Sequence, residues 1–201
     1  MIPITPADAL IAVDIQNDFL ENGALGVHEG HHTVPVVNMI LPLFSNAVFT
    51  RDWHPANHCS FSAEALYRDG SWPIHGVEGT PGARFHPDLH VPEEALVVSK
   101  GTLADREEYS GFQATDAGLA EWLRGRGVRR IFLAGIATDY CVHFTALDGV
   151  REGFEVWVIE DAVRGVSPET TAQTWRDLDA AGVKRVHSAD LCRQTAPDRE
   201  P

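Results

Sequence analysis

A single cysteine lies where a nucleophile could be activated. Residues 130–134 form a short, apolar, β-rich run, Gly135 interrupts that run, and Cys141 follows soon after. Thr138 or Asp139 can cap a helix whose first turn holds Cys141. The unpaired N–H groups and partial positive charge of a helix N-terminus favour a thiolate and can bind an oxyanion. A lone cysteine is more often a small buried apolar residue, so the pattern leaves both interpretations open.

Two charged side chains end other predicted strands. Asp14 directly follows the apolar run 9–13, and Lys100 follows the run 95–99. The carboxyl ends of parallel strands meet at one edge of a sheet, where such sheets bind ligands. At that edge Lys100 can favour the thiolate of Cys141, while Asp14 can take the thiol proton and return it to a leaving amine. Attack on a carboxamide then gives a thioester and ammonia, followed by hydrolysis. Taken singly, Asp14 also fits a loop-capping carboxylate and Lys100 a solvated surface charge.

Further polar side chains have the types and spacing of metal ligands. Asp52 and His54 follow a predicted strand at residues 46–50, and two residues apart in extended chain they point to the same side. His75 can reach them from a long loop, and this set leaves coordination positions open, which suits Zn²⁺ first, or Fe²⁺ or Mn²⁺. His58 is a fourth candidate ligand, or equally a surface histidine. The pattern is weak evidence by itself, because an Asp-x-His spacing is common.

Short strands alternate with helical segments along the chain. Strands are expected at residues 9–13, 46–50, 95–99, 130–134, 154–159 and 183–186, and helices at 32–44, after Gly111, from Cys141 and at 168–181. This alternation predicts an α/β fold with three layers, in which a mainly parallel six-stranded sheet has helices on both faces. The long connection at residues 59–94 is of the size that usually has a function. We expect residues 1–201 to form a single domain, with a frayed polar tail from about residue 193.

Composition narrows the classes of partner. The chain has 201 residues, of which 44% are hydrophobic, and a formal net charge of -13. Such an acidic chain is not expected to bind nucleic acid or an anionic membrane, whereas a small neutral or cationic ligand is easily accommodated. Three scattered cysteines favour a reducing cytoplasm over a disulfide framework. Because residues 1–19 have no basic region and no long apolar core, we expect neither secretion nor membrane insertion. The sequence leaves open whether the chain forms a homo-oligomer.

Five segments carry a resemblance to a known family. They are residues 13–19, 50–55, 72–80, 99–102 and 135–142. Together they resemble the nicotinamidases (the pyrazinamidase/nicotinamidase family) of the isochorismatase-like cysteine hydrolase superfamily, and the similarity extends from Ala9 to about His187. The resemblance implies hydrolysis of nicotinamide to nicotinate and ammonia in NAD salvage, with pyrazinamide as a further substrate.

The resemblance also assigns catalytic roles. It implies a catalytic triad of Asp14, Lys100 and Cys141. It further implies a cis peptide bond before Ala137 and an oxyanion hole formed by the N–H groups of Ala137 and Cys141.

Metal and substrate contacts follow from the same resemblance. The implied metal ligands are Asp52, His54 and His75, which separate nicotinamidases from metal-free relatives of the superfamily. Phe19 and Trp72 are implied to flank the pyridine ring of the substrate.

One position departs from the family pattern. Gly76 stands where the family commonly has a cysteine after the histidine, although that position need not bind metal. Cys59 and Cys192 match no catalytic position and are interpreted as structural thiols. Two alternatives remain open: a hydrolase of another small amide or ureido compound, and a catalytically silent metal-binding or interaction protein that keeps the fold without the chemistry.

Overall fold

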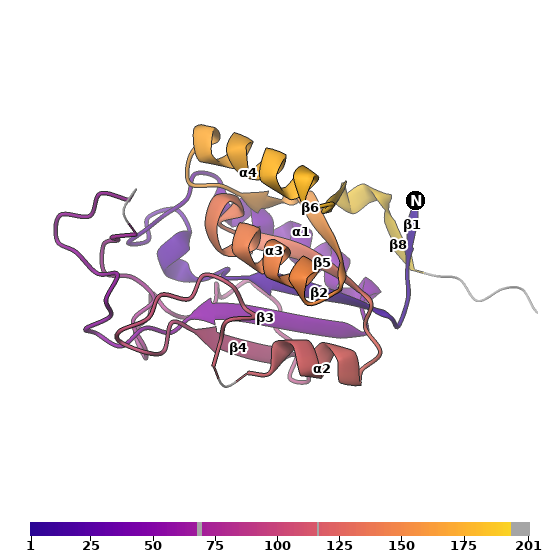
Figure 1. Ribbon diagram of the computed structural model, residues 1–201, viewed down its shortest axis with the longest axis horizontal. Coiled ribbons are helices and arrows are strands. Elements are labelled where there is room, and N and C mark those ends of the chain that lie inside the picture. Colours follow the sequence, from indigo (N-terminus) through magenta and orange to yellow (C-terminus); the bar gives the residue numbers. More distant parts are fainter. Residues whose placement is uncertain (68–69, 116, 194–201) are drawn as a thin grey trace, which may run out of the picture.

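The computed structural model describes residues 1–67, 70–115 and 117–193 and contains a parallel sheet between two layers of helices (Figure 1). The order of its six strands is β4-β3-β2-β5-β6-β7, and every neighbouring pair is parallel. The strands are β2 (Asp8–Val13), β3 (Asn46–Asp52), β4 (Leu96–Lys100), β5 (Arg130–Ile136), β6 (Glu155–Arg164) and β7 (Lys184–Val186). All of β2 is buried, as expected for a strand covered on both faces. The predicted α/β class is confirmed.

The helices cover both faces of the sheet. On one face α1 (Thr33–Ile40) packs against β5 and β6 (Figure 1). The other face is covered by α2 (Leu119–Gly125), α3 (His143–Arg151) and α4 (Pro168–Ala180). The first helix is shorter than the predicted segment 32–44, because Pro42 lies in a 3₁₀ turn, Leu41–Leu43, that ends it.

One strand is longer than predicted. The strand was expected to end at residue 159, but β6 continues through the acidic pair Glu160 and Asp161 to Arg164. Ala162 and Val163 are buried, and Gly135 of β5 pairs with Val163 after a shift of register. Acidic side chains at sites that face out of the core therefore do not stop the strand.

A second, two-stranded sheet was not predicted. It pairs β1 (Ile2–Ile4) with β8 (Leu191–Arg193) in parallel. Each strand has three residues, too few for a pattern to show in the sequence. Arg193, where the polar tail was expected to begin, belongs to β8, and the rest of that tail lies outside the described residues.

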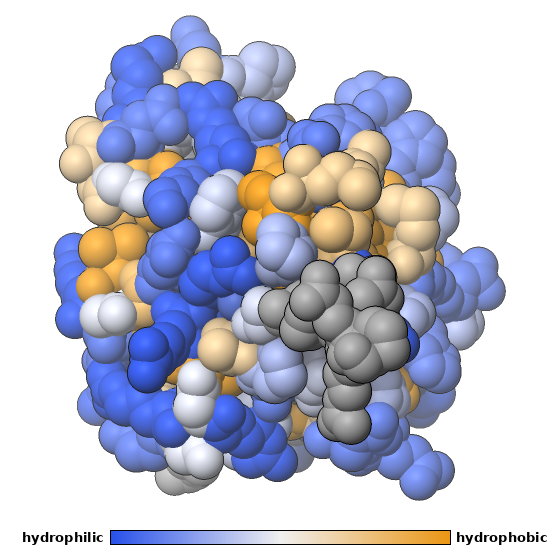
Figure 2. All heavy atoms as spheres, turned by 90° about the vertical axis from the view of Figure 1, so that its right-hand side faces the viewer, coloured by the Kyte–Doolittle hydropathy of each residue, from blue (hydrophilic) through white to orange (hydrophobic). Residues whose placement is uncertain are grey.

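The two ends of the main sheet differ. The end that carries the N-terminus and β8 presents a mostly hydrophilic surface with a local apolar patch (Figure 2). The long connections gather at the opposite end, beyond the carboxyl ends of β3 and β4 (Figure 1). Among the helices that the structure describes, none combines the length and apolar composition needed to cross a membrane.

Candidate active site and metal centre

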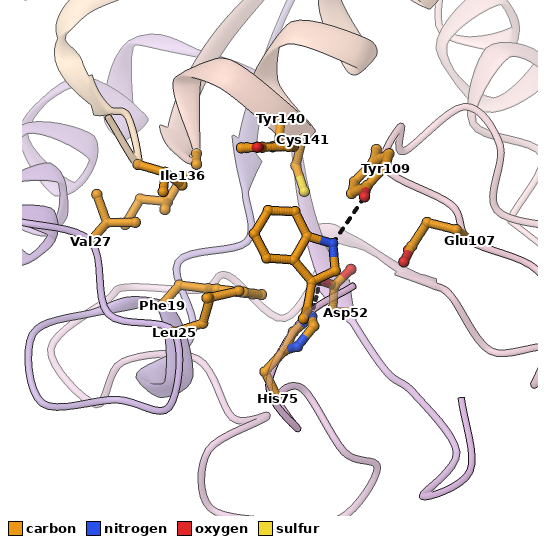
Figure 3. A pocket seen from close by; sticks show the side chains of 13 residues that line it. Phe19, Leu25, Val27, Asp52, His75, Glu107, Tyr109, Ile136, Tyr140 and Cys141 are labelled. Atoms are coloured by element: carbon orange, nitrogen blue, oxygen red, sulfur yellow. Dashed lines mark hydrogen bonds and ion pairs between the residues drawn. The ribbon is translucent and has the colours of Figure 1, made fainter. Parts of the chain in front are cut away.

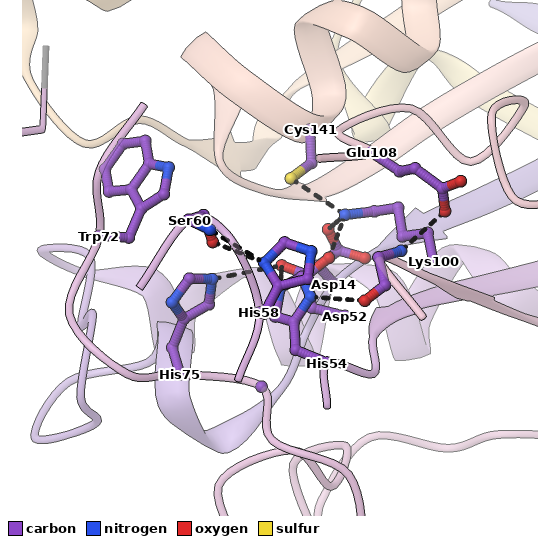
Figure 4. Close-up of polar contacts among 12 residues, drawn as sticks. Asp14, Asp52, His54, His58, Ser60, Trp72, His75, Lys100, Glu108 and Cys141 are labelled. Carbon is purple, nitrogen blue, oxygen red and sulfur yellow. Dashed lines mark hydrogen bonds and ion pairs between the residues drawn. The ribbon is translucent and has the colours of Figure 1, made fainter. Parts of the chain in front are cut away.

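Asp14, Lys100 and Cys141 meet at the carboxyl ends of three strands (Figure 4). The Nζ of Lys100 lies 2.8 Å from Oδ2 of Asp14 and 3.3 Å from Sγ of Cys141. The hydroxyl of Thr50 donates a hydrogen bond of 2.6 Å to the other Asp14 oxygen. Asp14 and Lys100 are both 0% exposed, so Lys100 is not the solvated surface charge that the sequence left open.

Burial determines the resting charges of this group. It raises the pKa of the Cys141 thiol well above its usual range, and the Lys100 ammonium opposes the shift only in part. Burial also raises the pKa of the Asp14 carboxyl, again against Lys100. Burial on its own lowers the pKa of Lys100, but the carboxylates of Asp14 and Asp52 raise it well above its usual range. Lys100 favours the thiolate as expected, but burial outweighs this effect, so a base must take the thiol proton.

The turn before Cys141 differs from the predicted helix start. The Ile136–Ala137 peptide is cis, and residues Thr138–Val142 form a π-helical turn that leads into α3. No side chain caps this turn. Asp139 instead accepts hydrogen bonds from the N–H groups of Val166 and Ser167, at 2.9 and 3.2 Å, and from the hydroxyl of Thr170. Asp139 therefore connects two segments: the turn that holds Cys141 and the start of α4.

The three predicted metal ligands converge beside the triad. Oδ2 of Asp52 lies 3.5 Å from Nε2 of His54 and 3.7 Å from Nε2 of His75. Nδ1 of His54 donates to the Gly101 carbonyl at 2.8 Å, and Nδ1 of His75 donates to the Pro73 carbonyl at 2.7 Å. These bonds leave each Nε2 to face Asp52, which is the usual support for histidine ligands.

The donor set fits a divalent cation. All three side chains are buried, and Nε2 of His54 has no hydrogen-bond partner among the described residues. Burial alone raises the pKa of Asp52, but Lys100 and His54 hold it well below its usual range, so the carboxylate is ionised. One carboxylate and two imidazoles suit zinc and similar metals. A buried nitrogen that makes no other hydrogen bond and faces a carboxylate can bind a metal ion together with that carboxylate.

Gly101 packs directly against one of these histidines. Its φ of 62° is in the left-handed region, and a Cβ at this position would lie 2.3 Å from Cε1 of His54. Its carbonyl accepts the His54 hydrogen bond, and its N–H donates to the buried carboxylate of Glu108 at 2.8 Å. Only glycine combines this conformation with so close an approach.

His58, the fourth candidate ligand, does not point at Asp52. Its Nδ1 is bonded to the Ser60 hydroxyl at 2.8 Å, and its Nε2 donates to the Arg106 carbonyl at 2.9 Å. Both ring nitrogens are therefore engaged, although His58 stacks beside His54 with ring centroids 4.1 Å apart.

An aromatic pocket opens in front of Cys141 (Figure 3). Its empty volume, including space open to solvent, is about 430 Å³, and most of the side chains that line it are apolar or aromatic. Phe19 and Trp72, the two predicted ring contacts, both line it, and Nε1 of Trp72 donates to the Tyr109 hydroxyl at 3.0 Å. Tyr109 and Tyr140 also line the pocket and were not predicted, because nothing in the spacing of an isolated tyrosine reveals that it faces a pocket.

Comparisons with known proteins agree with this site. The model of the isochorismatase domain family matches residues 8–190. The chain is 36% identical over 200 residues to a nicotinamidase of Acinetobacter baylyi, covering 91% of this chain and 94% of the relative. It is similar to the crystal structure of Pyrococcus horikoshii pyrazinamidase in complex with zinc, with 46% identity, a TM-score of 0.82 and coverage of 90% and 99% of the two chains. It is also similar to PnC1 from L. infantum in complex with nicotinate, with 36% identity, a TM-score of 0.88 and coverage of 96% and 99%.

Proposed function

Because the chain belongs to the isochorismatase family and, within it, to the nicotinamidases, we propose that it hydrolyses nicotinamide to nicotinate and ammonia in NAD salvage. Pyrazinamide, whose ring and carboxamide are similar, is a further proposed substrate. The observation that carries the proposal is the meeting of Cys141, Asp14 and Lys100 at an aromatic pocket that also receives Asp52 and His75.

The catalytic cycle follows from the positions of these groups. Asp14 takes the thiol proton while Lys100 stabilises the sulfur anion, which attacks the carboxamide carbon. The backbone N–H groups of Ala137 and Cys141 are proposed to hold the oxyanion. Asp14 then returns the proton to the amide nitrogen as the C–N bond breaks, which releases ammonia and leaves a thioester on Cys141. Asp14 next takes a proton from water, whose oxygen attacks the thioester. Collapse of that adduct releases nicotinic acid, which loses its proton to the ammonia in solution to give nicotinate, and the proton held by Asp14 restores the thiol.

Asp52, His54 and His75 are proposed to hold a divalent ion, with zinc the first candidate because a similar pyrazinamidase was crystallised with zinc. When bound, such an ion offers an open coordination position to the pyridine nitrogen of the substrate or to a water that contacts this nitrogen. Phe19 and Trp72 line the pocket from the loops, and we propose that they flank the ring.

An alternative substrate keeps the same chemistry. Any small amide or ureido compound that fits the aromatic pocket could form the same thioester or carbamoyl adduct at Cys141.

The three cysteines are free, which supports a reducing cytoplasm as the compartment.

Ammonia release tests the proposal directly. Purified protein is assayed with nicotinamide and with a panel of small amides and ureido compounds, before and after removal of metal with a chelator. We expect nicotinamide to give the highest kcat/KM, and we expect the chelator to abolish its turnover until zinc is added back. A higher kcat/KM for a ureido compound would reassign the substrate, and full activity after chelation would refute the metal dependence.

A further inference from the structure

Two neighbouring strands of the sheet end at different places. β2 pairs with β3 as far as Val13 and Thr50, and the N–H of Asp14 still donates to the Thr50 carbonyl at 3.1 Å. Asp14 then takes a φ of 48°, so the chain turns away from the sheet. β3 continues to Asp52, which pairs with Lys100 of β4 on its other side. The main-chain N–H and carbonyl of Asp52, which face the side where β2 has ended, therefore need other hydrogen-bond partners.

The side chain of Gln16 supplies these partners. Its Oε1 accepts the Asp52 N–H at 2.7 Å, and its Nε2 donates to the Asp52 carbonyl at 2.8 Å. The same Nε2 donates to the Ala83 carbonyl at 2.9 Å, and the residue is 0% exposed. A side-chain amide thus takes the place of a strand peptide and continues the ladder for one more residue.

Asp52, whose main chain Gln16 binds, contacts both Lys100 and the two histidines of the metal site. One carboxylate oxygen of Asp52 is ion-paired with Lys100, and the other faces His54 and His75. A small rotation of the Asp52 main chain would move both oxygens, since the carboxylate has little freedom beyond its two side-chain torsions.

We propose that Gln16 is a positioning residue that fixes the main chain of Asp52, so that its carboxylate reaches the metal and Lys100 together. The inference rests on the proposed metal-dependent function. It predicts that an apolar side chain of the same length, which fills the space without the hydrogen bonds, weakens metal binding. A residue that only filled the core would tolerate this change.

Gln16→Met is the main test, and Asn17→Met is its matched control. Asn17 is the next residue, and its Nδ2 donates to the Pro81 carbonyl at 2.8 Å, so it secures the same loop as Ala83 without contacting Asp52. Zinc affinity is measured on each full-length protein by competition with a chromogenic chelator, without any amide present. We expect Gln16→Met to raise the Kd for zinc by about 10- to 100-fold, the usual scale for groups that orient metal ligands. Asn17→Met should change it by less than about twofold, since neither the three metal ligands nor their hydrogen-bond partners are altered.

Gln16→Glu provides a second variant. A carboxylate still accepts the Asp52 N–H but cannot donate to either carbonyl, so it should also weaken zinc binding while circular dichroism and the Tm of the metal-free protein show a folded chain. Unchanged zinc affinity in both folded Gln16 variants would overturn the proposal, and so would equal losses in Gln16→Met and Asn17→Met. If neither Gln16 variant folds, Gln16 is structural and the proposal is wrong. A wild-type protein that binds zinc but releases no ammonia from nicotinamide would refute the proposed function without affecting this comparison.

Discussion

The Nζ of Lys100 lies 3.3 Å from Sγ of Cys141 while the same ammonium is ion-paired with Asp52. One buried cation therefore contacts the proposed nucleophile and a proposed metal ligand. Its third partner is Asp14, at 2.8 Å. Because these groups are buried, a change of charge at one of them is felt strongly by the others. The amide chemistry and the metal site should consequently be treated as one electrostatic unit.

Replacing the nucleophile should remove turnover and leave the fold intact. We expect Cys141→Ala to release no ammonia from nicotinamide, and Cys141→Ser to be nearly as poor, because a hydroxyl has too high a pKa for Lys100 to ionise. Steady-state assays and thermal unfolding measure the two effects on the same samples. Appreciable turnover by the alanine variant would exclude the thioester route.

Replacing Asp14 should change turnover and thiol reactivity in opposite directions. Burial raises the pKa of the Cys141 thiol, and the Asp14 carboxylate raises it further. Asp14→Asn removes that negative charge, so the pKa of the Cys141 thiol falls. A larger fraction of Cys141 is then thiolate at any pH below that pKa. We expect faster alkylation of Cys141 by iodoacetamide at pH 8, followed by mass spectrometry, but a loss of turnover of about 100-fold or more, the scale of a general acid/base.

The control for this experiment is the exposed Cys59, whose alkylation rate should be the same in both proteins. Wild type and variant are compared at equal metal content. Slower alkylation of Cys141 in Asp14→Asn would contradict the assigned sign, and near-normal turnover would remove Asp14 from the proton pathway.

Benzamide can report whether the metal acts on the substrate ring. It has the same carboxamide on a six-membered ring but lacks the pyridine nitrogen, so we expect it to be a much poorer substrate. His54→Ala should then lower kcat/KM for nicotinamide strongly and for benzamide little. The difference between the two effects measures the coupling between His54 and the pyridine nitrogen, as in a double-mutant cycle. Equal losses for both substrates would mean that the metal is structural or acts on the amide.

Asp139 should matter more for stability than the side chain that caps α4. Asp139→Ala leaves the N–H groups of Val166 and Ser167 and the Thr170 hydroxyl without their carboxylate acceptor. We expect a loss of about 2–3 kcal/mol in the free energy of unfolding, as for buried hydrogen bonds to a charged group. Ser167→Ala removes the helix cap and should cost about 1 kcal/mol. Urea denaturation compares them, and a larger loss for Ser167→Ala would contradict this assignment.

The fold could be predicted because apolar strands alternate with helical segments, and parallel strands bring their carboxyl ends together. That geometry explains why Asp14, Lys100 and Cys141 were expected to meet, although their catalytic roles stay predictions. Gln16 was not recognised, because its function depends on where β2 stops relative to β3, which local sequence does not encode. The partners of Asp139 lie around the start of α4, far from it in the sequence, and the burial of Cys141 outweighs the local charge pattern. Such effects arise only from tertiary packing.

Gly101 follows Lys100 directly in the chain, and this adjacency limits how the protein could evolve. The lysine side chain contacts Cys141 and Asp14, while the next carbonyl orients His54. Any side chain at residue 101 would collide with the His54 ring. A descendant that abandoned the metal could relax residue 101 only after losing the histidine, whereas one that kept the metal must preserve both residues in that order. Loss of the metal should therefore be recorded in the sequence first at the histidine and later at the glycine.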